Sequence, residues 1–148
     1  MSQSDQQVNA YRFRIVLRRT GPHIWRRVVV RGDSTLGQLH QTVQALFGWA
    51  DSRPHRFVLR CRSFGASATA TASSWPAPEV LLSEFNLQTK ERLFYDYDFD
   101  HANVPVWRHD IRLRRVTTVP QSAQSFNQRQ EYMHSLQVIS TILRILTI

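Results

Sequence analysis

The chain has 148 residues, 42% of them hydrophobic, and a formal net charge of +8. This length predicts a single domain that can bury a core, and no apolar run is long enough for a transmembrane helix. The single cysteine, Cys61, excludes an internal disulfide and a zinc site built from thiolates. Residues 1–7 have neither a basic start nor an apolar segment, so we expect no signal peptide, no membrane partner and a cytoplasmic location.

Arginine supplies almost all of the positive charge, because Lys90 is the only lysine. The planar guanidinium group suits bidentate contacts to phosphate or carboxylate better than an ammonium group does. A basic chain also favours a polyanionic partner such as nucleic acid. Genomic base composition is the alternative cause of the arginine excess, and a single sequence leaves both causes open.

The first part of the chain predicts a β-hairpin. Residues 1–10 are polar and are expected to be disordered. From Tyr11 to Arg18, apolar side chains alternate with arginines at the period of two that is typical of a strand. A turn at Thr20-Gly21-Pro22 interrupts the pattern, and the β-branched run over residues 24–31 predicts a second strand.

A helix is predicted over residues 35–47. Thr35 and Gln38 have the spacing of a capping box, and Gly48 occupies the usual position for a helix end. One helical face carries Leu36, Leu39, Val43, Leu46 and Phe47, and the other carries Gln38, Gln41 and Gln44. We expect the apolar face to cover the apolar side of the hairpin.

The middle of the chain predicts three more strands. Residues 56–62 alternate, with Cys61 on the apolar side, so a buried structural thiol is expected there. Residues 63–78 are rich in Ala, Ser and Thr and predict a flexible loop, and residues 80–87 predict one helical turn. Residues 91–99 and 106–116 alternate again and are expected to pair antiparallel.

The tail, residues 117–148, begins with a polar linker. Apolar residues then recur at heptad spacing, at Tyr132, Leu136, Ile139, Leu143 and Leu146. This pattern predicts a C-terminal helix that packs on the core or on another subunit, so a homo-oligomer formed through residues 132–146 is one expectation. The β-branched content of the segment leaves a strand as the alternative.

These elements predict an α+β fold. We expect an antiparallel or mixed sheet of about five strands, one main helix across one face, and the C-terminal helix. The hairpin followed by a helix and a strand gives the chain a β-grasp-like start, which is an analogy of element order only. The domain is expected to span residues 11–116.

Several motifs resemble a known family. They are Pro22-His23-Ile24-Trp25-Arg26-Arg27, Thr35-Leu36-Gly37-Gln38-Leu39-His40, Phe47-Gly48-Trp49, His55-Arg56-Phe57, Tyr95-Asp96-Tyr97-Asp98-Phe99 and Trp107-Arg108-His109-Asp110-Ile111. In this order they resemble the plasmid pRiA4b ORF-3-like family, also described as IS1096 passenger or TnpR-like proteins. Residues 100–106 are longer than the compact link of the family pattern, and the tail diverges from it. The resemblance implies an α+β passenger protein of plasmids and mobile elements with no established biochemical function.

The densest group of acids and histidines is the first candidate site. It comprises Asp96, Asp98, His101 and His109, with Asp100 nearby and His40 and His55 more distant. Carboxylates and imidazoles are ligands for divalent ions, and residues two apart on a strand share a face. No metal-binding motif fixes the spacing. The structural alternative has Asp98 and Asp100 capping the turn backbone and His109 as a half-buried, hydrogen-bonding residue.

The second candidate is an arginine-rich sheet face that binds nucleic acid. Its residues are Arg12, Arg14, Trp25, Arg27, Arg60, Arg62, Arg112 and Arg114. Arginines bind phosphate and an aromatic ring can stack on a base, the combination that single-strand binders use. The alternative is a solvated face whose arginines pair with Asp96, Asp98 and Asp110 across strands.

The sequence therefore predicts a binding or accessory protein of plasmids or mobile elements that contacts nucleic acid through its arginine face. The alternatives are a metal-dependent enzyme that uses Asp96, Asp98 and His109, or a protein-protein interaction module. No serine lies in a nucleophile elbow and no phosphate-binding glycine loop is present. We therefore lean against an enzyme and expect no cofactor, with a divalent metal left open.

Overall fold

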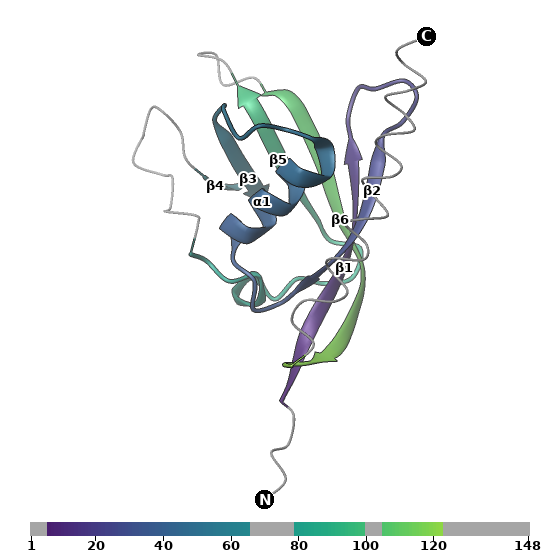
Figure 1. Cartoon of the computed structure of the whole chain (residues 1–148), viewed down its shortest axis with the longest axis vertical. Helices are drawn as coiled ribbons and strands as arrows, with labels where there is room; N and C mark the ends of the chain where they lie inside the picture. Colours follow the sequence, from purple (N-terminus) through teal and green to yellow (C-terminus); the bar gives the residue numbers. More distant parts are fainter. Residues whose placement is uncertain (1–5, 66–78, 100–104, 123–148) are drawn as a thin grey trace, which may run out of the picture.

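The computed structural model describes residues 6–65, 79–99 and 105–122. They form one antiparallel sheet of six strands in the order β2-β1-β6-β5-β3-β4, with helix α1 (Leu36–Phe47) across one face (Figure 1). The strands are β1 (Gln7–Leu17), β2 (Trp25–Arg31), β3 (His55–Leu59), β4 (Arg62–Phe64), β5 (Arg92–Phe99) and β6 (Pro105–Pro120). The 3-10 turn η1 (Leu82–Phe85) corresponds to the turn predicted over residues 80–87.

The predicted α+β fold class is wrong. Within the described residues the fold is mainly β, because helical structure is confined to the 12 residues of α1 and the 4 of η1. All the strand pairings are antiparallel, including β1 with β6, so the β-grasp analogy does not extend beyond the order of the first elements. The C-terminal helix predicted over residues 132–146 lies outside the described residues.

Helix α1 forms as the sequence predicts. Thr35 is the N-cap, and its hydroxyl accepts from the Gln38 amide while the Gln38 side chain accepts from the Thr35 amide, which completes the capping box. Gly48 ends the helix with a φ of +70°, a conformation that costs glycine little. One detail of the predicted helix is wrong, since Gln44 is buried and not solvent-facing.

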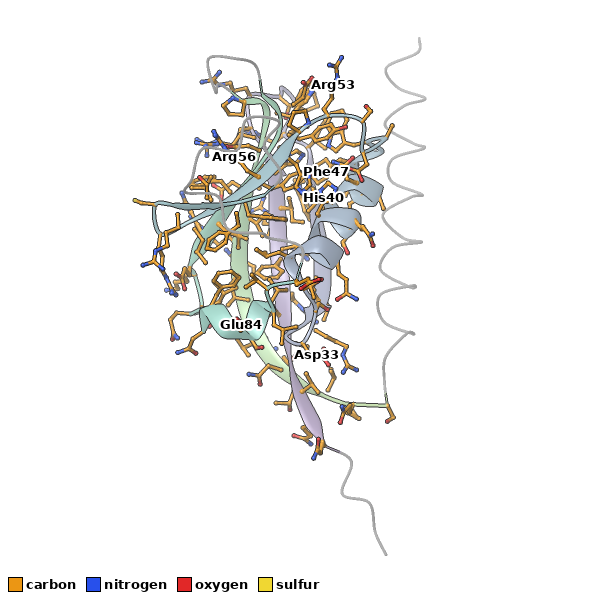
Figure 2. The ribbon with its side chains drawn as sticks, turned by 90° about the vertical axis from the view of Figure 1, so that its left-hand side faces the viewer. Asp33, His40, Phe47, Arg53, Arg56 and Glu84 are labelled. Carbon is orange, nitrogen blue, oxygen red and sulfur yellow. The ribbon has the colours of Figure 1, made fainter. Side chains whose placement is uncertain are left out.

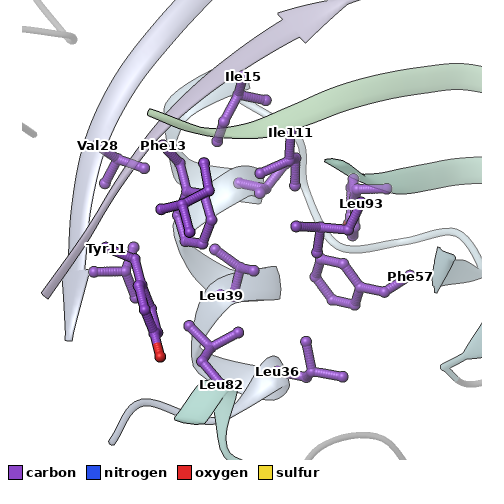
Figure 3. Packing of buried hydrophobic residues seen from close by; sticks show 14 of the residues in the cluster. Tyr11, Phe13, Ile15, Val28, Leu36, Leu39, Phe57, Leu82, Leu93 and Ile111 are labelled. Carbon is purple, nitrogen blue, oxygen red and sulfur yellow. The ribbon is translucent and has the colours of Figure 1, made fainter. Parts of the chain in front are cut away.

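The core lies between α1 and the sheet (Figure 3). Each strand contributes alternate residues to it, as a half-buried sheet does. The labelled members of this core are Tyr11, Phe13, Ile15, Val28, Leu36, Leu39, Phe57, Leu82, Leu93 and Ile111, all of which are buried. Burial of such side chains contributes roughly 1.5–3 kcal/mol each. This packing fixes which face of every strand is left for polar side chains.

The sixth strand arises from a turn that the alternation pattern conceals. Leu59 pairs with Arg62, so Arg60 and Cys61 form a two-residue hairpin loop, with φ of +49° and +62°. Such loops prefer Asn-Gly, and Arg-Cys carries no such signal. The expected burial of Cys61 is wrong for the same reason, because a turn residue projects into solvent, and this thiol is exposed.

Two strands extend beyond the expected domain limits. β1 begins at Gln7 instead of Tyr11, and β6 continues to Pro120, where it pairs with Gln7. The extra length comes from polar and β-branched residues that alternation alone does not mark. Within the described ranges no helix is both long enough and apolar enough to cross a membrane.

Candidate functional site

The sheet has two chemically different faces (Figure 2). The labelled His40 lies on the side of the sheet that α1 covers, and Arg56 lies on the opposite side. The α1-covered face is mostly apolar, but it also carries a histidine-containing cluster, the core histidine His109 and the buried Arg26, whose Nε donates to the Leu46 carbonyl of α1. The opposite face carries arginines from five of the strands.

Four arginines lie side by side on this open face. Arg27 of β2 pairs with Arg14 of β1, which pairs with Arg112 of β6, which in turn pairs with Arg92 of β5. We call these four residues the arginine row. Directly opposed residues on neighbouring strands have Cβ atoms about 4.5–5.5 Å apart, and like charges at that spacing destabilise a sheet. The row therefore concentrates positive charge at a cost in stability.

Three members of the row have no acidic partner. Arg14, Arg27 and Arg112 form no ion pair with any residue in the described ranges, while Arg92 lies 3.6 Å from a carboxylate oxygen of Asp110. Arg14 and Arg27 both lie over the ring of Trp25, each 5.1 Å from its centroid. The aromatic ring attracts these guanidinium groups without neutralising them. Arg27 is exposed, whereas Arg14 is half-buried and its Nε is buried without a hydrogen-bond partner.

Other arginines of the same face are neutralised. Asp96 is fully buried and accepts from Arg56 at 2.9 Å and from Arg108 at 2.7 and 2.9 Å. Asp110 also lies 3.5 Å from Arg18. The alternative of cross-strand pairing with aspartates thus describes Arg56, Arg108 and, within the row, Arg92. It does not describe Arg14, Arg27 and Arg112.

The remaining predicted nucleic-acid residues lie around or away from the row. Arg12 is exposed on the same face, opposite Arg115 of β6, and Arg114 lies at the bulge beside that pair. Arg62 pairs with the buried Leu59, which places it on the other side of the sheet. Arg60 lies in the β3–β4 turn and binds Glu91, with Nε 2.6 Å from its Oε1. Arg60 and Arg62 therefore lie apart from the row.

The structure does not bring together the acids and histidines predicted as a metal site. Asp96 points to the arginine face, whereas His109, opposite Tyr95, points into the core beneath α1. Asp98 is half-buried, 4.0 Å from Arg53, and His101 lies outside the described residues. Metal binding by this set stays a prediction, and the opposite orientation of Asp96 and His109 counts against it.

A different cluster assembles around His40, which the sequence marked only as a distant candidate. We call His40, Gln44, Asp51, His55 and Tyr95 the His40 cluster. The Asp51 amide donates to Gln44 Oε1 at 2.9 Å, which orients the Gln44 amide so that its Nε2 donates to the Tyr95 hydroxyl at 2.7 Å. Tyr95 lies 2.7 Å from His40 Nδ1, and His40 Nε2 lies 2.8 Å from Asp51 Oδ1.

These contacts form a closed hydrogen-bonded circuit with one direction. The ionised Asp51 carboxylate can only accept, so a neutral His40 carries its hydrogen on Nε2 and donates it to Asp51. Its Nδ1 is then an acceptor and takes the hydrogen bond of the Tyr95 hydroxyl, whose oxygen accepts from Gln44. Burial raises the pKa of the Tyr95 hydroxyl, which keeps the phenol proton in place. The circuit fixes one tautomer of His40.

His55 stands beside this circuit without joining it. Its ring stacks on the His40 ring, with centroids 3.5 Å apart and planes 12° from parallel. Burial and the adjacent His40 ring lower the pKa of His55 to about 4, so it is neutral at pH 7. Its ring nitrogens make no hydrogen bond to any described residue. The cluster therefore offers a neutral imidazole with a free lone pair.

His109 belongs to the core on the same side. The Trp49 indole donates to His109 Nε2 at 3.3 Å, so the ring proton is on Nδ1, which donates to the Tyr95 carbonyl at 3.1 Å. Burial lowers the pKa of His109 to about 4, against a smaller opposing contribution of the Tyr95 carbonyl. These contacts agree with the structural alternative of a hydrogen-bonded histidine, but His109 is fully buried and not half-buried.

The neutral state of His109 predicts a loss of stability in acid. A histidine whose folded pKa lies below its unfolded value of about 6.5 contributes stability above pH 6.5, and that contribution is lost as the pH falls towards 4. We expect the loss to reach about 3 kcal/mol in urea unfolding between pH 7 and 4. His109→Gln should remove this component, and His23→Gln, an exposed histidine, should retain it. An unchanged pH dependence in His109→Gln would contradict the assignment.

The comparisons with known proteins identify the family. The family model of the plasmid pRiA4b ORF-3-like proteins matches residues 9–131. The chain belongs to the plasmid pRiA4b ORF-3-like family. The resemblance inferred from the motifs is confirmed, and the match covers the whole described sheet except its first two strand residues.

One curated protein and one solved structure are similar to this chain. The uncharacterized protein y4hQ of Sinorhizobium fredii (strain NBRC 101917 / NGR234) is 31% identical over 107 residues, which are 71% of this chain and 53% of that protein. The chain thus spans about half the length of that relative. The crystal structure of MM3350, a protein of unknown function from Methanosarcina mazei Go1, superposes with a TM-score of 0.64 at 20% identity. It covers 90% of this chain and 82% of the other, which shows a shared fold.

Proposed function

We propose that this family member binds single-stranded nucleic acid through the arginine row and Trp25. The observation that carries the proposal is the juxtaposition of Arg27, Arg14 and Arg112 on adjacent strands with no acidic partner in the described ranges. On the same face, Asp96 pairs with Arg56 and Arg108, and Asp110 lies near Arg18 and Arg92, so these acids leave the other three arginines of the row without a partner. A ligand that brings negative charge would neutralise Arg14, Arg27 and Arg112.

The dimensions of the row suit a phosphate backbone. Neighbouring strands lie about 4.8 Å apart, so four strands place their arginines along roughly 15 Å. The guanidinium groups present donors that match phosphate oxygens in a bidentate manner. A nucleic-acid strand that runs across the sheet could therefore contact the arginines of the row in succession through its phosphates.

Trp25 favours a single strand over a duplex. Trp25 is 40% exposed, which is unusual for so large an apolar residue, and the guanidinium groups of Arg14 and Arg27 each lie 5.1 Å from its ring centroid. An unpaired base can stack on such a ring, and base–aromatic stacking contributes about 1–3 kcal/mol. A duplex keeps its bases stacked on one another, so it would interact with the arginines through its phosphates but would not stack a base on Trp25.

The family context supports a role on mobile DNA. The family takes its name from a plasmid open reading frame, and we infer that this member is an accessory protein of plasmids or mobile elements in the cytoplasm. Self-association through residues 132–146 stays a separate prediction, since those residues lie outside the described ranges.

Fluorescence anisotropy with a labelled 12-nucleotide oligothymidine tests the proposal. We expect saturable binding with a Kd of about 1–100 µM near 0.15 M salt, the range of non-specific nucleic-acid binding. A duplex of equal length should bind more weakly, and Trp25→Ala should reduce the difference between the two. Absence of binding to either at 0.05 M salt would refute the proposed function.

A further inference from the structure

Three metal-ligand side chains converge beside the end of α1. One ligand atom each from His40, Asp51 and His55 lies within 4.8 Å of the other two. The three residues come from α1, from the loop after it, and from the first position of β3. Helix packing therefore brings together groups that are up to 15 positions apart in sequence. None of the three belongs to the arginine row or faces that side of the sheet.

We propose that His40, Asp51 and His55 bind one divalent transition-metal ion of the Zn²⁺ class. Two imidazoles and one carboxylate are ligands that Zn²⁺ and its neighbours in the first transition row prefer, whereas Mg²⁺ and Ca²⁺ prefer oxygen alone. The inference does not rest on nucleic-acid binding, because the two sites use different residues on opposite sides of the sheet.

The three ligand atoms need at most a small movement to bind one ion, and two of the ligands can make it. Atoms bound to one ion at about 2.1 Å lie at most about 4.2 Å apart, and the three ligand atoms lie within 4.8 Å of one another. The Asp51 side chain is 58% exposed on its loop and can rotate. His55 forms no hydrogen bond to a described residue, so its ring can tilt out of the stack until its lone pair points at the ion. His40 is buried and supplies the fixed ligand.

The hydrogen-bonded circuit also specifies what happens to the His40 proton. An ion bound at Nε2 takes the place of the proton now shared with Asp51, and the ring proton moves to Nδ1, where the Tyr95 oxygen can accept it. Tyr95 then supports the ligand from its second nitrogen, as the partners of metal-bound histidines commonly do. The Tyr95 hydroxyl loses its present acceptor, so coordination replaces one hydrogen bond of the circuit.

Three protein ligands leave coordination positions open. Asp51 is exposed and His55 is only half-buried, so water can reach the ion from the loop side. Sites of this kind, with three ligands and an open position, are typical of metals that act as Lewis acids, whereas structural zinc sites have four protein ligands. The predicted class of ligand is therefore a metal ion accessible to solvent.

Isothermal titration calorimetry with ZnCl₂ tests the site. The protein should be prepared without a polyhistidine tag and dialysed against EDTA and then metal-free buffer. We expect one Zn²⁺ per chain and a higher Tm in its presence, because the ion binds only the folded site. Co²⁺ should give visible absorption bands that report coordination by nitrogen and oxygen.

Variants separate this site from adventitious binding. His55→Ala and Asp51→Asn alter half-buried or exposed groups, and each should weaken Zn²⁺ binding roughly tenfold or more while circular dichroism shows a folded protein. His23→Ala, which removes an exposed histidine of the β1–β2 turn, should bind like the wild type. The proposal is overturned if the wild type binds no stoichiometric Zn²⁺, or if His55→Ala and Asp51→Asn bind as tightly as His23→Ala.

Discussion

Replacing Arg27 and Arg112 together with glutamate is expected to weaken oligothymidine binding by at least about a hundredfold. The change turns two phosphate-binding charges into repulsive ones and leaves alternating signs along the arginine row. A hundredfold loss corresponds to about 2.8 kcal/mol, roughly 1.4 kcal/mol for each position. Anisotropy titrations of the wild type and the double variant at equal salt measure the effect.

The same variant separates binding from folding. Opposite charges on directly opposed strand positions stabilise a sheet by roughly 0.2–1 kcal/mol, so Arg27→Glu with Arg112→Glu should unfold at equal or higher urea than the wild type. A double variant of Arg19 and Arg62 to glutamate has the same change in net charge, and both residues are exposed outside the row. It should retain binding within about threefold. If the two double variants lose binding equally, net charge and not the row controls it.

Asp96→Asn is expected to lower the free energy of unfolding by about 3 kcal/mol. The Asp96 carboxylate has no exposed surface and holds the guanidinium groups of Arg56 and Arg108 on the two neighbouring strands. Asparagine has the same shape, but it is uncharged and turns an amide N–H towards one of these donors. Breaking a buried ion pair on one side costs about 3–5 kcal/mol, and the partial exposure of Arg108 places this case at the low end.

Asp98→Asn provides the matched control for that measurement. Asp98 is two residues along the same strand, but it is half-buried and only 4.0 Å from Arg53. Surface ion pairs contribute at most about 1 kcal/mol, so urea unfolding should change by less than that. A loss below 1 kcal/mol for Asp96→Asn as well would show that the carboxylate does not hold β3, β5 and β6 together.

Alternation along single strands was sufficient to predict which side chains share a face. Arg14, Arg27 and Arg112 each alternate with buried residues, so their presence on one face followed from the period of two. Alternation did not predict that these arginines lie directly opposite one another on adjacent strands. That alignment depends on the register of β6 between β1 and β5 and on a bulge near Arg12. Register is set by tertiary pairing, which the pattern of one strand does not encode.

The His40 cluster was harder to predict because its members are dispersed. His40 and Gln44 are four residues apart on α1, a spacing that puts two polar groups on one helical turn facing Tyr95. Their burial could have been suspected only by placing α1 against β5. The turn at Cys61 was missed for a local reason. Arg60 and Cys61 adopt positive φ without the glycine or asparagine that marks such loops.

The salt dependence of oligothymidine binding tests the central claim most directly. Three to four arginines that each neutralise one phosphate predict a plot of log K against log salt concentration with a slope between about −2 and −3, since each contact on a single strand contributes about −0.7. Replacing Arg112 with glutamine should make the slope less steep by about 0.7. A slope near zero, or one that Arg112→Gln leaves unchanged, would contradict binding through the arginine row.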